Sequence, residues 1–127
     1  MWGKPPFSIS DNCAVDVRNL SLSREWYKRN LGLRDAPSGV REEDSGRSFA
    51  DLCFDDGAFI SLLELEPGES AESNHVIFFA KNLEKAQQWL VGRQVFVEPI
   101  TTDSGGNRFF RFQDLDGNKI EVCVEPE

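Results

Sequence analysis

His75 is the only histidine in the chain, and this count restricts the chemistry that one copy of the protein can perform. A metal centre built from several histidines is excluded within one chain, because each imidazole ligand needs its own residue. A Ser-His-Asp or Cys-His mechanism would have to use His75 as its base. Any metal binding or proton transfer by an imidazole therefore depends on this one position.

The three cysteines, Cys13, Cys53 and Cys123, do not form a recognisable redox or metal motif. They are too few and too scattered for a disulfide framework, and no pair has the CxxC spacing of zinc or redox sites. Free thiols fit a reducing compartment, so we expect a cytoplasmic protein. We expect Cys13 to fill apolar space in the core.

The composition argues against nucleic-acid and membrane partners. The chain has 127 residues with 39% hydrophobic and 28% charged side chains, which is typical of a globular domain. Its 14 basic and 22 acidic residues give a net charge of −8, whereas nucleic-acid binding needs a clustered basic face. There is no secretion-signal pattern, and the longest apolar run, 76–80, is far too short to span a membrane.

An internal repeat divides the chain into two similar halves. Residues 12–20 match residues 75–83 at an offset of 63, which places Trp26 over Trp89. We expect both tryptophans to pack a helix onto a sheet. Neither half could bury both faces of its sheet alone, so we expect one domain over 1–127. Its parts are a first repeat at about 8–65, a polar linker at 66–73 and a second repeat at about 74–125.

Each repeat predicts the element order βαβββ. Asn19 and Asn82 are suited to begin the helices, since an asparagine side chain can accept hydrogen bonds from the first free amides. Gly32 and Gly92 stand where glycines that end helices are common. The predicted strands cover about 12–18, 33–40, 48–54 and 57–65 in the first repeat and about 74–80, 95–100, 107–113 and 118–124 in the second.

Strand alternation predicts which polar side chains share a face. Successive side chains point to opposite sides of a strand, so Ser61, His75, Phe79 and Glu121 should all face away from the helices. Arg111 lies one residue off a Phe110/Phe112 stripe and should join them. Such a face would form a partly apolar pocket with a few polar groups. There the forked donors of Arg111 could hold an anionic group, or Arg111 could pair with a carboxylate such as Asp51.

Two segments carry a resemblance to a known family. Residues 18–33, Arg-Asn-Leu-Ser-Leu-Ser-Arg-Glu-Trp-Tyr-Lys-Arg-Asn-Leu-Gly-Leu, and residues 114–121, Asp-Leu-Asp-Gly-Asn-Lys-Ile-Glu, resemble the vicinal oxygen chelate superfamily. Glyoxalase I, bleomycin-resistance proteins, fosfomycin-modifying transferases and extradiol dioxygenases belong to this superfamily. The resemblance covers about 8–125 and departs from the usual pattern at Leu115, where proline is common. It implies an α+β fold of two βαβββ repeats paired into one cup-shaped sheet domain, and a homodimer.

In metal-dependent members, four positions on the strands hold the metal ion. The resemblance places them here at Asn12, Ser61, His75 and Glu121. Only His75 and Glu121 are good ligands for a divalent ion such as Mn, Ni, Zn or Fe, because an amide oxygen is weak and a hydroxyl weaker. The resemblance therefore implies at most an incomplete metal site.

Two functions follow as expectations. The first is a bleomycin-resistance-like protein with a degenerate metal site, which binds a small ligand in the cup through Asn12, Ser61, Phe79 and Arg111. The alternative is a divalent-metal-dependent lyase or thiol transferase of the glyoxalase or fosfomycin-resistance type, with His75 and Glu121 as metal ligands or catalytic groups. Without a metal, His75 hydrogen-bonded to Glu121 could relay a proton or serve structure alone.

Overall fold

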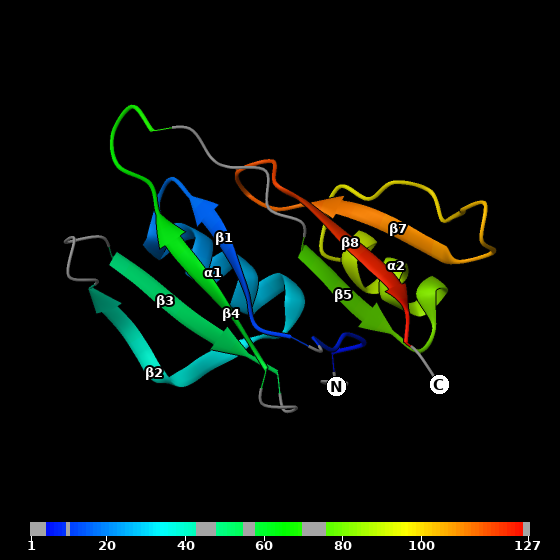
Figure 1. Cartoon of the computed structure of the whole chain (residues 1–127), viewed down its shortest axis with the longest axis horizontal. Helices are drawn as coiled ribbons and strands as arrows, with labels where there is room; N and C mark the ends of the chain where they lie inside the picture. The colour runs from blue at the N-terminus through cyan, green and yellow to red at the C-terminus, as the bar shows by residue number, and fades with distance from the viewer. Residues whose placement is uncertain (1–4, 10, 43–47, 55–57, 70–75, 126–127) are drawn as a thin grey trace.

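A computed structural model gives the chain two modules of the same construction (Figure 1). It describes residues 5–9, 11–42, 48–54, 58–69 and 76–125. The first module consists of β1 (Cys13–Val17), α1 (Leu20–Leu31), β2 (Arg34–Glu42), β3 (Ser48–Cys53) and β4 (Phe59–Glu64). The second consists of β5 (Val76–Ala80), α2 (Leu83–Val91), β6 (Thr101–Thr102), β7 (Arg108–Gln113) and β8 (Lys119–Val124).

Each module arranges its strands in one four-stranded sheet, with the orders β1-β4-β3-β2 and β5-β8-β7-β6. The first and last strands of a module pair in parallel, and the other neighbours pair antiparallel. The sheets are not closed, and their edge strands β1 and β5 contact each other in the middle of the molecule (Figure 1). The predicted α+β fold with two βαβββ modules is confirmed.

Both helices lie on the same side of the sheets (Figure 1). α1 contacts β3 and β4, and α2 contacts β7 and β8. Strand side chains that point toward the helices are fully buried, among them Ile60, Leu62, Ile120 and Val122. We call the opposite side of the two sheets the helix-free face.

Asparagine side chains begin both helices, as predicted. Asn19 accepts a hydrogen bond from the Leu22 amide and Asn82 accepts one from the Lys85 amide, each at 3.0 Å. Gly32 ends α1 in the left-handed conformation, whereas Gly92 follows α2 in the right-handed one. Within the described residues, neither helix is long and apolar enough to cross a membrane.

The predicted strand at about 95–100 is wrong. In this region only an isolated bridge between Val97 and Phe112 and the two-residue β6 pair with β7. Pro99 has no amide hydrogen to donate to a neighbouring strand. Gln94, with a φ of 63°, turns the chain immediately before the predicted strand. Val95 is still buried, because its apolar side chain packs into the core without a strand.

The buried apolar side chains of both modules form one cluster, and Phe7 belongs to it. The Phe7 ring is 6.4 Å from the ring of Phe54 in the first module and 6.1 Å from that of Phe78 in the second. Two backbone hydrogen bonds between Ser8 and Phe79, of 2.8 and 2.9 Å, fix this N-terminal segment beside β5. The segment therefore helps to join the two modules.

Asp114, in the turn between β7 and β8, connects the second module to α1. Its Oδ2 accepts a 2.5 Å hydrogen bond from the Tyr27 hydroxyl and a 2.9 Å bond from the Asn118 side chain. Its Oδ1 accepts from the amides of Asp116 and Asn118 at 2.9 and 2.8 Å. Burial raises the pKa of Asp114, while these hydrogen bonds oppose that increase. The carboxylate is thus buried and fully bonded, as a buried charge requires.

Replacing Gly32 by alanine should destabilise the protein more than replacing Gly106. Both glycines have positive φ, of 76° and 82°, so each variant should lose about 1–2 kcal/mol of unfolding free energy. A Cβ on Gly32 would also overlap the ring of Pro5, whereas a Cβ on Gly106 would meet no atom within 4 Å. We expect a further loss of about 1–3 kcal/mol for Gly32→Ala, measured by urea denaturation. Equal losses would contradict a fixed position of Pro5.

Tyr27→Phe tests the connection between the modules. This substitution removes the hydroxyl that donates a hydrogen bond to the buried Asp114 carboxylate. It should lower the unfolding free energy by about 1.5–3 kcal/mol. Ser21→Ala removes an exposed hydroxyl from the same helix and should leave stability unchanged or slightly higher. Chemical denaturation of both variants measures the difference. A loss below about 0.5 kcal/mol would show that the contact contributes little.

Candidate ligand-binding site

The helix-free face carries the polar side chains that strand alternation predicts. Arg111 in β7 and Glu121 in β8 lie on this face, while their chain neighbours Phe112 and Ile120 are buried toward the helices. Ser61 in β4 occupies the same face of the first sheet, between the buried Ile60 and Leu62. Phe79 in β5 is half-buried on this face as well. The described candidates therefore come from both modules to one side of the protein.

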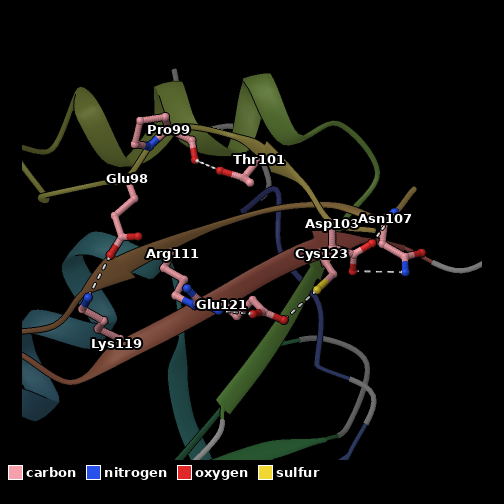
Figure 2. A network of polar contacts seen from close by, with 9 residues as sticks. All are labelled: Glu98, Pro99, Thr101, Asp103, Asn107, Arg111, Lys119, Glu121 and Cys123. Atoms are coloured by element: carbon pink, nitrogen blue, oxygen red, sulfur yellow. Dashed lines mark hydrogen bonds and ion pairs between the residues drawn. The ribbon is translucent and has the colours of Figure 1, made fainter. Parts of the chain in front are cut away.

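Arg111, Glu121 and Cys123 form a polar cluster on the second sheet (Figure 2). Arg111 and Glu121 are direct cross-strand partners, with Nη2 and Oε1 3.3 Å apart. The Cys123 thiol donates a hydrogen bond to the other oxygen of Glu121 at 3.2 Å. Both carboxylate oxygens are thus engaged, and the Arg111 side chain, 41% exposed against 16% for Glu121, presents the accessible end of the pair.

The environment of Cys123 keeps its thiol protonated. Burial, the hydrogen bond to Glu121 and the nearby charges of Glu121 and Asp103 raise the pKa of Cys123 to about 12, although Arg111 opposes the shift. A thiolate, not a thiol, is the nucleophile in cysteine chemistry. At neutral pH Cys123 is therefore a hydrogen-bond donor to Glu121 and not a reactive group.

Asn12 and Ser61, two of the predicted ligand-contacting residues, are engaged in bonds within the first module. The Asn12 amide oxygen accepts from the backbone amide of Phe59 at 3.1 Å. The Ser61 hydroxyl donates to Asp51 at 2.5 Å. Asp51 is only 1% exposed and stands directly opposite Ser61 in the β3–β4 pair. The hydroxyl thus serves to satisfy a buried carboxylate.

The described donor atoms do not fit a first-row metal centre. His75, one of the four predicted metal positions, lies outside the described residues. The remaining three positions supply an amide, a hydroxyl and one carboxylate, and each already bonds a protein neighbour. Within the described chain, no group of three or more His, Cys, Asp or Glu side chains could hold a metal ion. We therefore derive no chemical step through a metal.

Asp51 is a residue of this face to which sequence reasoning assigned only a pairing role. Its signal was a carboxylate in the middle of an otherwise apolar strand, Ser48–Cys53. Arg111, for which Asp51 was one predicted partner, pairs with Glu121 on the neighbouring strand. The pairing follows from the β7–β8 register, which the sequence does not reveal.

A pocket of about 670 Å³ lies off this cluster, where the ends of the two modules meet. Of the four predicted ligand contacts, only Phe79 lines it. No sequence pattern predicts this pocket, because its wall depends on where the N-terminal segment lies. Its other lining residues are Pro5, Pro6, Phe7, Ser8, Gly32, Arg34, Cys53, Phe54, Ala80, Lys81, Asn82, Lys85 and Glu125.

Residues 10–122 match the sequence profile of one protein family, described as Glyoxalase/Bleomycin resistance protein/Dioxygenase superfamily. This range includes both modules and every described candidate residue on the helix-free face. A comparison with curated proteins gives no significant match.

Solved structures with similar folds come from several bacteria. A superfamily member from Sphaerobacter thermophilus DSM 20745 has a TM-score of 0.72 at 18% identity, over 91% of this chain and 96% of its own. A glyoxalase family protein from Enterococcus faecalis has a TM-score of 0.70 at 17% identity, over 91% and 96%. TnmS3, an antibiotic binding protein from Streptomyces sp. CB03234, has a TM-score of 0.70 at 17% identity, over 91% and 95%. At these identities the likeness shows the fold.

Glu121→Gln should make Cys123 more reactive toward iodoacetamide at about pH 9. Removing the carboxylate charge lowers the thiol pKa, so more thiolate forms and the rate should rise by about threefold to tenfold. Arg111→Gln should slow the reaction, because Arg111 opposes the increase in the Cys123 pKa. Mass spectrometry of each cysteine measures the rates, with Cys13, whose pKa burial raises to about 11, as the internal reference. Equal Cys123 rates in the wild type and both variants would contradict the contacts of Cys123 with Glu121 and Arg111.

Proposed function

Because the chain belongs to the Glyoxalase/Bleomycin resistance protein/Dioxygenase superfamily, we propose that it binds a small organic molecule on the helix-free face without using a metal ion. The observation that carries this proposal is the state of the inherited ligand positions. Asn12, Ser61 and Glu121 have their oxygen atoms in hydrogen bonds to Phe59, Asp51 and the Arg111–Cys123 pair. A metal would compete with these partners for the same oxygen atoms.

The face combines polar and apolar contacts of the kind that hold small molecules. Half-buried Ile77 and Phe79 supply apolar area from β5. Arg111 lies over the ring of Phe109, 5.1 Å from its centroid, which restricts the guanidinium and leaves its outer donors accessible. These donors suit a carbonyl or other oxygen of the ligand, because a guanidinium presents several N–H groups in a fixed plane.

The charge of the protein favours a neutral or cationic ligand. The chain carries a net charge of −8, and Glu121 and the buried Asp51 lie on the face itself. Such a surface attracts cations and repels anions over distances of about 10 Å at moderate ionic strength. A small organic ligand is further supported by the similar fold of TnmS3, an antibiotic binding protein from Streptomyces sp. CB03234.

Metal analysis and ligand binding together test the proposal. Protein purified without an affinity tag should contain substoichiometric metal and should not be loaded by micromolar Mn, Ni, Zn or Fe. Stoichiometric metal that His75→Ala abolishes would overturn the proposal. That result would favour the alternative, a divalent-metal-dependent lyase or thiol transferase that uses His75 and Glu121.

A thermal-shift screen identifies the ligand class. Cationic drugs such as bleomycin, catechols and methylglyoxal–thiol adducts are the probes, and a true ligand should raise the melting midpoint with concentration. Arg111→Gln should weaken binding of the hit by about tenfold, the effect of one lost hydrogen bond to a charged group. Arg108→Gln is the matched control on the same strand, because Arg108 faces α2 and pairs with Glu84. Equal effects of the two variants on binding would argue against the helix-free face as the ligand-binding site.

A further inference from the structure

The pocket at the junction of the two modules is a separate feature from the helix-free cluster. Its volume of about 670 Å³ lies within the usual range of small-molecule sites, about 300–1,000 Å³. Neither Arg111 nor Glu121 lines it, and Phe79 is the only residue that it shares with the proposed ligand contacts. A molecule in this pocket would therefore meet a different set of side chains.

Aromatic and proline rings form the inner wall of the pocket. The rings of Phe7 and Phe54, each residue 7% exposed, stack with centroids 6.4 Å apart, and the half-buried Phe79 lies on the same lining. Pro5 and Pro6 add two further apolar rings. Flat aromatic molecules pack well against such rings, because offset and edge contacts add to the burial of apolar area.

The rim of the pocket is basic. Lys81 and Lys85 line it together with Arg34, and Glu125 is the only acidic residue among the described ones that line it. Within the described residues, the side chains of Lys81 and Lys85 form no salt bridge, whereas Lys28 pairs with Asp35 and Lys119 pairs with Glu98. Both lysines thus lack a carboxylate partner in the part of the chain that the structure describes.

The stability of α2 does not account for the positions of these lysines. Lys81 precedes and Lys85 follows the helix-capping Asn82, so both stand near the positive end of the helix dipole. Positive charges are unfavourable at this end by about 0.3–1 kcal/mol. The favourable residue of this first turn, Glu84, is engaged with Arg108. The lysines instead place positive charge at the mouth of an apolar pocket.

We propose that this pocket binds a small aromatic carboxylate, with its ring against Phe7, Phe54 and Phe79 and its carboxylate beside Lys81 and Lys85. The apolar wall supplies the burial of the ring. The two ammonium groups supply charge-assisted hydrogen bonds to the carboxylate, which are stronger than bonds between neutral groups. The ligand class differs in charge from that expected on the helix-free face.

Isothermal titration with 2-naphthoate and its neutral isostere 2-naphthamide tests the proposal on the full chain. The wild-type protein should bind naphthoate about tenfold more tightly than the amide, and the preference should shrink as the salt concentration rises. The double variant Lys81→Gln/Lys85→Gln should bind both probes equally. Both lysines are exposed, so the variant should retain the wild-type circular dichroism spectrum and melting midpoint.

A second double variant controls for net charge. Lys28→Gln/Lys119→Gln also removes two positive charges, but from residues that do not line the pocket. It should therefore keep the preference for naphthoate. The proposal is overturned if naphthoate does not bind at millimolar concentration, or if the Lys81/Lys85 variant keeps the preference. If only Arg111→Gln loses the preference, naphthoate binds on the helix-free face. That result would overturn the proposed pocket site and leave the proposed function standing.

Discussion

Asp114 lies almost fully buried between the two modules, and its carboxylate must be hydrogen-bonded there because an unpaired buried charge is very costly. Tyr27 of α1 and Asn118 of the same turn meet that need. The Asn118 side chain also donates to the backbone oxygen of Asp16 in β1, at 2.9 Å, so one turn holds a helix and a strand of the other module. A second polar contact, from the Trp89 indole to the Asn30 carbonyl at 2.8 Å, links α2 to the end of α1.

This docking keeps both helices on one side of the sheets and thereby determines what the other side can do. The helix side takes buried apolar side chains from β1, β3, β4, β5, β7 and β8, and Phe7 completes the shared core. Polar residues such as Arg111, Glu121 and Ser61 are left on the helix-free face, where they bond to cross-strand neighbours. The partners are decided by register, since residues directly opposite each other come within bonding distance.

Sequence reasoning reached as far as periodicity and local caps allow. The repeat, the Asn19 and Asn82 caps and the facing of Arg111 away from the helices all follow from patterns of a few residues. The predicted strand at 95–100 is wrong because only Val95 is buried there, Phe96 is exposed, and the backbone pairs with β7 only at the isolated Val97 bridge. The pocket was not predicted, because no local sequence pattern in the N-terminal segment indicates that it pairs with β5. Contacts between distant segments depend on tertiary packing, which short patterns do not encode.

The inherited metal positions illustrate how this scaffold separates fold from chemistry. Asn12 and Ser61, two of the positions that the family resemblance assigns to a metal ion, are hydrogen-bonded to Phe59 and Asp51 and so link neighbouring segments of the first module. The charges are distributed unequally as well: carboxylates gather on the helix-free face, while Lys81 and Lys85 gather at the pocket between the module ends. The two binding proposals therefore differ in the ligand charge that they require, with a neutral or cationic ligand at the first location and an anionic one at the second. The N-terminal segment contributes to the pocket wall through its position against β5, and the same position places Phe7 in the core.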